Sequence, residues 1–191
     1  MRQSNLTPLL AALLLAPVLA WAAPAECLPE IAAAESRYHL PAGLLVSMAL
    51  VESGRPDPET GFLTPWPWTV HSQGQGFFFD TADEAVGAVR KTLTAGDALI
   101  DVGCLQVDLF HHPAAFGTLG EAFDPARNAD YAARYLSRLA HERGSWLEAV
   151  AAYNAGRPYN GTDYLSKVLY RWRGIRLTAA RRAAFVQTSL P

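Results

Sequence analysis

Residues 41–54 read PAGLLVSMALVESG, and this stretch decides which kind of fold the chain can adopt. Pro41 suits the first turn of a helix, because the N–H that proline lacks would have no partner there. From Leu44 to Val51 the residues are apolar on almost every side, which is typical of a helix buried all round. Glu52 follows at the C-terminal end, and Gly54 ends the helix. We therefore predict a central buried helix with a carboxyl group in its last turn.

Further helices are expected around the central one, because apolar residues recur at helical spacing on both sides of it. The predicted ranges are 29–39, 81 or 83 to 93, 124–139, 146–153, and 162 or 163 to about 172. In the first of these, Glu35 is expected on the solvent side. Two short strands, 68–71 and 76–79, flank turn residues and predict a hairpin. The fold class is therefore mainly α, of the α+β kind: a helical bundle around a central buried helix with a small β-hairpin.

The length and composition fit one domain, and the net charge limits which classes of partner are expected. The 191 residues are 50% hydrophobic and carry a net charge of -2, which gives no reason to expect nucleic acid or an anionic membrane surface as a partner. A cluster of arginines near the C-terminus is interpreted as a solvated helical face (Arg171, Arg173, Arg176, Arg181 and Arg182). The histidines show no ligand spacing and no phosphate-binding glycine loop is present, so we expect no metal and no cofactor.

The N-terminus has the pattern of an export signal. Arg2 precedes an apolar run from Leu9 to Leu19, and small residues flank Trp21 at the expected cleavage site. The run is too short to cross a bilayer comfortably, which leaves an uncleaved anchor as the alternative. We predict a signal peptide over 1–22, a domain over 26–175 and a C-terminal tail over 176–191. The protein is then exported to the periplasm, without a stable membrane span after signal cleavage.

Export changes how the two cysteines are interpreted. Cys27 and Cys104 both follow the signal segment, and an even number of cysteines in an oxidising compartment favours a disulfide. Such a link closes a long loop and stabilises the fold by roughly 3–4 kcal/mol in the chain-entropy model. The alternative is two buried free thiols.

The carboxyl group of Glu52 is the first candidate for chemistry. A charge at the end of an apolar helix is costly to bury, and apolar surroundings are expected to raise the pKa of this group. A carboxylic acid that stays protonated near neutral pH can give its proton to a leaving group. The alternative is a solvated glutamate, or one that caps its own helix.

Two more segments contain polar side chains next to apolar residues, and these side chains are further candidates for the site. In the segment 101–107, DVGCLQV, Gln106 offers an amide that can both donate and accept, as sugar hydroxyls and N-acetyl groups require. In the segment 152–156, AYNAG, Tyr153 could orient a carboxyl group and Asn154 could hold a sugar. Taken singly, each has an ordinary structural explanation: an edge strand for the first and a helix stop for the second.

The three segments, E-S-G, G-x-L-Q-V and A-Y-N-A-G in that order, resemble the motifs of family 1 lytic transglycosylases, the Slt-type domain. The resemblance extends over about residues 27–172 and implies a lysozyme-like fold. Within the family, the chain resembles the small, single-domain, secretion-associated (VirB1-like) type. The resemblance implies peptidoglycan glycan strands as substrate, and components of a secretion or flagellar apparatus as partners.

The resemblance also implies roles for individual residues. Glu52 matches the single catalytic acid–base, and Ser53 matches its neighbour that contacts the reacting end of the substrate. Gln106 matches the glycan-contacting amide, Tyr153 the residue that orients the glutamate, and Asn154 a further substrate contact. Tyr164 resembles the aromatic residue that closes the site, although a tyrosine packed in the helical core is an equal alternative.

Two features depart from the family pattern. The segment 65–98 is longer than the family minimum and contains Trp66, Trp68 and the run 77–79, which predicts an aromatic platform for sugars or, alternatively, rings packed on the core. Asp101 stands two residues before Gly103, where animal-type lysozymes carry their second carboxylate. Two carboxylates would allow hydrolysis, although Asp101 could instead only brace the hairpin.

The sequence thus predicts a lytic transglycosylase that cleaves the MurNAc–GlcNAc β-1,4 bond and leaves a 1,6-anhydro-muramyl product. One alternative is a lysozyme-type muramidase that uses Asp101 as well as Glu52. Another is a wall-binding scaffold that has kept the fold without the activity.

Overall fold

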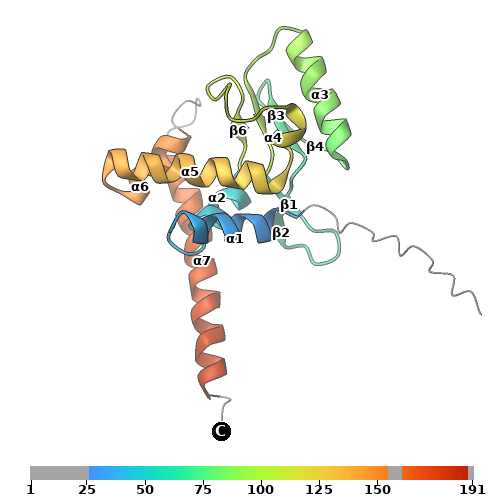
Figure 1. The fold of residues 1–191 in the computed structure, drawn as a ribbon. Helices are drawn as coiled ribbons and strands as arrows, with labels where there is room; N and C mark the ends of the chain where they lie inside the picture. Colours follow the sequence, from blue (N-terminus) through green and yellow to red (C-terminus); the bar gives the residue numbers. More distant parts are fainter. Residues whose placement is uncertain (1–25, 155–160, 189–191) are drawn as a thin grey trace, which may run out of the picture.

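A computed structural model of the chain describes residues 26–154 and 161–188. The predicted signal peptide over 1–22 lies outside the described residues. The elements in chain order are α1 (Cys27–Arg37), α2 (Leu44–Glu52), β1 (Gly54–Pro56), β2 (Leu63–Pro65), β3 (Thr69–Ser72), β4 (Gln75–Phe78), α3 (Ala82–Thr94), β5 (Ile100–Val102), β6 (Val107–Asp108), α4 (Leu119–Ala122), α5 (Pro125–Arg143), α6 (Trp146–Tyr153) and α7 (Gly161–Thr188). Helices dominate, and a small antiparallel sheet lies at one side of the helical bundle (Figure 1), so the predicted mainly-α, lysozyme-like α+β fold is confirmed.

Helix α2 forms the centre of the larger hydrophobic core. Leu44, Leu45, Met48 and Ala49 are fully buried, as the apolar sequence of this helix predicts. Helices α1 and α7 pack against α2, and α5 and α6 complete the bundle. Glu52 is the last residue of α2, so the predicted position of the carboxyl group at the helix end is confirmed.

The N-terminus of α2 is capped from another helix. The Glu35 carboxylate, on α1, accepts hydrogen bonds from the backbone N–H groups of Gly43 (2.9 Å) and Leu45 (2.6 Å). A carboxylate in this position satisfies donors that the helix itself leaves unpaired and interacts favourably with the helix dipole. The expectation that Glu35 faces solvent is wrong, since only 8% of the residue is exposed.

The sheet runs in the order β4-β3-β5-β6, with every neighbouring pair antiparallel. The predicted hairpin is β3–β4, and its turn residues Gln73 and Gly74 have φ angles of 51° and 76°. Positive φ at both positions is what a type I′ turn requires. Strands β1 and β2 pair separately, where the sequence predicts a proline-rich loop.

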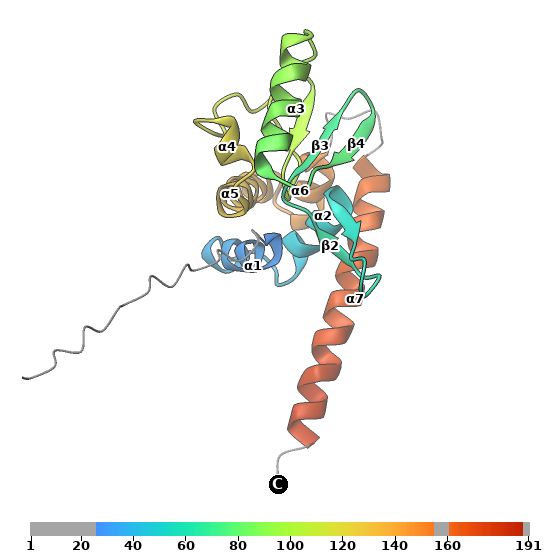
Figure 2. The ribbon, with the colours of Figure 1, turned by 90° about the vertical axis from the view of Figure 1, so that its right-hand side faces the viewer.

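A second, smaller core holds helix α3 against the sheet. Val70, Val89, Ile100, Val102 and Phe123 are buried in it. The Thr81 side chain accepts a hydrogen bond from the Glu84 N–H, and the Glu84 carboxylate accepts from the Thr81 N–H, which makes a capping box at the start of α3. Figure 2 shows α3 and the sheet forming a lobe on one side of α2.

The predicted disulfide between Cys27 and Cys104 is confirmed, and the two half-cystines are 77 positions apart in sequence. Both cysteines are buried. The bond joins the first residue of α1 to the turn between β5 and β6. It therefore fastens the N-terminal helix to the segment that carries the second sequence motif.

Helix α7 differs most from its prediction. Its expected end near Trp172 is wrong, because the helix continues to Thr188. The Trp172 indole N–H donates to the Ala42 carbonyl at 2.9 Å, and Ile175 lies against Gly43. Beyond these contacts the helix extends away from the bundle (Figures 1 and 2). Among the described helices, α7 included, none is both long enough and apolar enough to span a bilayer.

Candidate active site

The turn between β5 and β6, residues 103–106, is the centre of the candidate site. Gly103 has a φ of +80°, and a Cβ atom there would lie 2.3 Å from the Asn128 side-chain nitrogen and 2.9 Å from the Ala122 carbonyl oxygen. Only glycine can occupy this position without displacing its neighbours. The backbone of Gly103 therefore lies close to Asn128 and to the Ala122 carbonyl.

Asn128, on α5, holds this turn from beneath. Its Nδ2 atom donates to the carbonyls of Val102 and Ala122, each at 3.0 Å, and its Oδ1 atom accepts from the Leu105 N–H at 2.9 Å. The residue is fully buried. Asn128 was not predicted as a site residue, although a polar residue on the apolar face of the helix 124–139 was the signal that could have revealed it.

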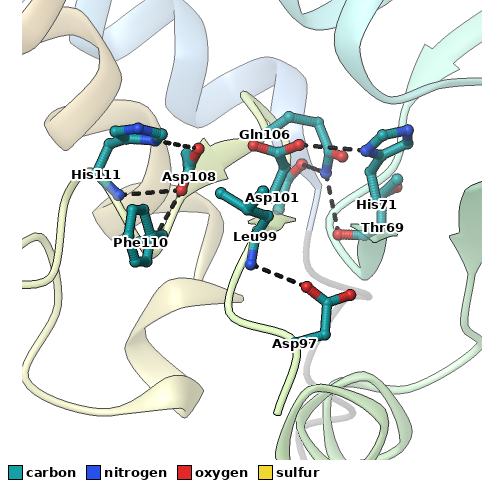
Figure 3. Close-up of polar contacts among 10 residues, drawn as sticks. Thr69, His71, Asp97, Leu99, Asp101, Gln106, Asp108, Phe110 and His111 are labelled. Carbon is teal, nitrogen blue, oxygen red and sulfur yellow. Dashed lines mark hydrogen bonds and ion pairs between the residues drawn. The ribbon is translucent and has the colours of Figure 1, made fainter. Parts of the chain in front are cut away.

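Gln106 follows with a φ of 47°, which is unusual for a residue with a side chain. Its Nε2 atom donates to the Thr69 carbonyl (3.1 Å) and the Gly103 carbonyl (3.0 Å), as Figure 3 shows. The amide nitrogen therefore ties the turn to β3. The side chain is buried and lines a cleft, and its contact with substrate stays a prediction.

The first motif meets this turn through Ser53. The Ser53 hydroxyl lies 2.7 Å from the Cys104 carbonyl oxygen and 3.3 Å from that of Ala49, and the residue is buried. Its neighbour Glu52 is half-buried, with its Oε1 atom inside the protein. Ser53 thus links the end of α2 directly to the second motif.

The third motif meets the same turn through Tyr153, the last residue of α6. The Tyr153 hydroxyl donates to the Leu105 carbonyl at 2.9 Å. Asn154 follows as the C-terminal cap residue of α6 and is buried. Ser53 and Tyr153 therefore bind consecutive carbonyls of the second motif, at Cys104 and Leu105.

A cleft of about 340 Å³ opens beside these contacts. Three predicted residues line it: Gln106, Tyr153 and Asn154. The described residues that line it also include a group that the sequence analysis did not single out for the site (Val107, Asp108, His111, His112, Tyr131, Tyr135 and Ala152). The added wall is mostly aromatic, which suits the faces of sugar rings.

The polar groups of this wall are paired with one another. Asp108 accepts from the backbone N–H groups of Phe110 and His111 and lies 2.7 Å from the His111 ring nitrogen (Figure 3). Burial opposes ionisation of Asp108, but the hydrogen bonds from His111 and Phe110 outweigh it and lower the pKa of the carboxyl group. The cleft therefore keeps a carboxylate on its wall.

His112 and two tyrosines form the other part of the wall. The His112 ring nitrogen lies 2.9 Å from the Tyr131 hydroxyl, and the ring packs edge-on against Tyr135. Burial lowers the pKa of His112 and raises the pKa values of Tyr131 and Tyr135. All three side chains are therefore held in their neutral forms near neutral pH.

Four predicted site residues are not among the described residues that line this cleft: Glu52 and Ser53 at the end of α2, Tyr164 and Asp101. Tyr164, on α7, is buried in the larger core. Asp101, on β5, is buried and its carboxylate lies 3.3 Å from the His71 ring nitrogen on β3 (Figure 3). These positions fit the alternatives given for them, a core tyrosine and a brace of the hairpin.

The aromatic residues of the segment 65–98 are divided between packing and exposure. The Trp66 indole N–H donates to the Phe79 carbonyl at 2.6 Å, and Trp68 packs against the smaller core. Phe77 and Phe78, on β4, are exposed. The aromatic platform stays a prediction, with the two phenylalanines as its open rings.

No group of three side chains that could hold a metal ion occurs in the described part of the chain, residues 26–154 and 161–188. The chemistry proposed below uses only side chains of this chain and groups of the substrate.

Comparison with known families gives one match. The family model of the transglycosylase SLT domain matches residues 88–179, slightly less than half of the chain. The match includes Gln106, Tyr153 and Asn154, whereas Glu52 precedes it. No curated protein matches the chain, and no solved structure matches it. The family match supports a lytic transglycosylase of family 1 that acts on peptidoglycan.

Proposed function

We propose that this protein is a lytic transglycosylase that cleaves the MurNAc–GlcNAc β-1,4 bond of peptidoglycan, with Glu52 as its only acid–base. The observation that carries the proposal is the meeting of three distant segments at one turn. Ser53 and Tyr153 bind the adjacent carbonyls of Cys104 and Leu105, and Gln106 lines the cleft beside them.

The reaction needs one group that first gives and then takes a proton. Glu52 protonates the glycosidic oxygen as the bond from C1 of MurNAc to that oxygen breaks. The N-acetyl group of the substrate supports the positive charge at C1. Glu52, now a carboxylate, removes the proton from the C6 hydroxyl of MurNAc, and that oxygen bonds to C1. The product is a 1,6-anhydro sugar, and no water is consumed.

Tyr153 has a defined part in this proposal. A phenol has one hydrogen to donate, and Tyr153 donates it to the Leu105 carbonyl. Toward a carboxyl group the hydroxyl can then only accept a hydrogen bond. It would therefore favour the protonated form of Glu52, which is the form needed for the first step.

The exported, periplasmic location and the service to a secretion or flagellar machine belong to the same proposal. They rest on the signal-like N-terminus and on the resemblance to the secretion-associated type. The roles of Ser53, Asn154 and Tyr164 in substrate binding are likewise proposed from the resemblance.

The test is digestion of purified peptidoglycan sacculi followed by mass spectrometry of the released muropeptides. Anhydro products lack one water relative to reducing-end products, so the two routes are separated by mass. We expect Glu52→Gln to lower product release at least a thousandfold, because the amide cannot carry the proton. Its circular dichroism spectrum and melting temperature should match those of the native protein.

The matched control is Glu59→Gln, which removes an exposed carboxylate between β1 and β2. It should digest sacculi at the native rate. Full turnover by Glu52→Gln would refute the assignment of the acid–base. Reducing-end products that disappear in Asp101→Asn would instead establish the muramidase.

A further inference from the structure

A second concave surface lies on α7, separate from the cleft. It is a groove of about 880 Å³ between α7, the end of α2 and the connection from β1 to β2. Its apolar lining comes from α2, the β1–β2 region and α7 (Leu50, Phe62, Leu63, Tyr170, Ile175 and Leu177). The groove shares no lining residue with the cleft of the candidate active site. A ligand in the groove would leave the cleft open.

The groove exposes an unusual amount of apolar side chain. Phe62 is 76% exposed and Tyr170 is 75% exposed, more than any other large hydrophobic residue of the described chain. Leu177 adds a third apolar side chain that is 55% exposed. The two aromatic residues are 108 positions apart in sequence, yet both line this one groove. A cluster of exposed apolar side chains of this kind marks a surface that binds a protein, a membrane or a ligand.

The charged side chains that line the groove have one sign, while Asp57 and Glu59 lie in the β1–β2 connection outside the lining. Among the described residues, the charged side chains of the lining are those of Arg171 and Arg173. Among the described side chains of α7, residues 162–181, the single carboxylate is Asp163, and it is bound to Lys167 at 2.9 Å. The arginines downstream have no carboxylate on their own helix to neutralise them. The ligand of this surface should therefore be apolar on one side and acidic beside it.

The shape of the groove distinguishes three candidate ligands: a bilayer, a second copy of the chain and a single helix of a partner protein. A bilayer surface is flat and cannot follow a groove walled by Phe62 on one side and α7 on the other. A second copy of the chain would bring another arginine-rich α7 with it if the two helices paired. A single helix with an apolar stripe fits a groove of this kind, and acidic residues beside the stripe would reach the arginines.

We propose that this groove is a docking site for an acidic amphipathic helix of a partner protein. Phe62, Tyr170 and Leu177 bind its apolar stripe, and Arg171 and Arg173 bind its carboxylates. The docking does not depend on cleavage of peptidoglycan, since no residue of the cleft takes part.

The test uses the full chain and synthetic peptides. One peptide carries leucines at helical spacing, i, i+3, i+4 and i+7, with glutamates elsewhere, and a second has the same composition in scrambled order. Fluorescence anisotropy measures the Kd of each. We expect the ordered peptide to bind at least tenfold more tightly than the scrambled one. High salt should weaken that binding, because surface charges are screened.

Matched variants locate the binding site. Leu177→Ser should weaken peptide binding at least tenfold, whereas Leu99→Ser, which alters a side chain of nearly equal exposure (57%) outside the groove, should not change it. Arg171→Glu with Arg173→Glu should abolish binding of the glutamate peptide and create binding of a lysine version of it. The same variants should digest sacculi at the native rate, and their melting temperatures report whether they fold.

Several results would overturn the proposal. Equal affinity for the ordered and scrambled peptides, or no measurable binding of either, would exclude a helix-docking groove. Tighter binding to vesicles of phosphatidylglycerol, lost in Leu177→Ser, would assign the surface to a membrane. Dimers in sedimentation that dissociate in Leu177→Ser would assign it to a second copy of this chain.

Discussion

Gly103 is the residue on which the geometry of the candidate site depends most directly. A side chain there would have to adopt a positive φ and would also collide with Asn128 and the Ala122 carbonyl. We expect Gly103→Ala to lower the free energy of unfolding by about 3 kcal/mol, from roughly 1–2 kcal/mol for the left-handed backbone and the rest for overpacking. Urea denaturation measures this loss.

The matched control for Gly103 is Gly96→Ala. Gly96 also has a positive φ, +91°, but a Cβ atom there would meet nothing within 4 Å. Gly96→Ala should lower the free energy of unfolding by about 1 kcal/mol, which is the contribution of the left-handed backbone alone. Equal losses in the two variants would show that Asn128 does not confine the turn.

His112 makes stability depend on pH. Burial lowers the pKa of His112 below its ordinary value of 6.5, so the folded protein holds the ring neutral while the unfolded chain binds the proton more readily. The contribution of His112 is therefore fully present above about pH 6.5 and is lost as the pH falls through that value toward the folded pKa. We expect the native protein to lose more stability between pH 8 and pH 5 than His112→Gln does.

Urea denaturation at a series of pH values tests this expectation, and NMR titration of the His112 ring gives its pKa directly. Parallel stability curves for the two proteins would contradict it. A ring that titrates at or above 6.5 would do the same.

At the scale of elements, α1 and α2 are joined by a cap rather than only by apolar contact. The Glu35 carboxylate accepts from three N–H groups at the start of α2, those of Gly43, Leu45 and Val46. Glu35→Ala would leave these donors without their acceptor inside the protein. Since each buried, unsatisfied group costs about 1–3 kcal/mol, and water can reach part of this site, we expect a loss of about 2–4 kcal/mol in urea denaturation.

Glu30→Ala is the control, because Glu30 lies on the same helix and caps no other element. It should change stability by less than about 0.5 kcal/mol. Hydrogen exchange adds an element-level measurement: in Glu35→Ala the first turn of α2 should lose protection before the rest of the helix. Uniform loss across α2 would argue against a local capping role.

The elements themselves followed from local signals, and the links between them did not. The hairpin β3–β4 was predictable because Gln73-Gly74 suits the turn that joins twisted strands. The pairing of β1 with β2 was not, since Pro56 and Pro65 indicate a loop on local grounds. Here contacts with α2 and the rest of the fold override the local preference.

At the scale of the whole molecule, α7 has two parts with different roles. Its first part packs on α2 through Val168, Trp172 and Ile175, and its second part extends beyond the bundle. A chain ended after Arg176 should therefore keep its fold, with a melting temperature within a few degrees of the native value and unchanged digestion of sacculi. This outcome would support the predicted domain boundary at residue 175.

A chain ended after Lys167 is the contrasting case. It lacks Val168, which is fully buried, and Trp172 and Ile175, which are half-buried; full burial of a large apolar side chain contributes about 1.5–3 kcal/mol. We expect loss of cooperative thermal unfolding, or a melting temperature lowered by well over ten degrees. If this shorter chain melts like the native protein, α7 is not part of the core.

The geometry of the candidate site depends on tertiary packing, although several of its residues were predicted from the sequence. Glu52, Gln106, Tyr153 and Asn154 stood out as polar residues at the edges of apolar segments. Their spacing could not show that Ser53 and Tyr153 bind neighbouring carbonyls, or that Asn128 holds the turn. It also gave no reason to place His112, Tyr131 and Tyr135 in the cleft wall.

The sequence by itself determined the central apolar helix with Glu52 at its end, the hairpin and the cysteine pair. These follow from periodicity, turn chemistry and redox context, which act over a few residues or on composition alone. Only the tertiary structure decided that Glu35 is buried as a cap, that Asp101 lies against His71, and that Phe62 and α7 line one groove. The reason is that hydrogen-bond partners and burial depend on which distant segments pack together, and that packing is a property of the whole fold.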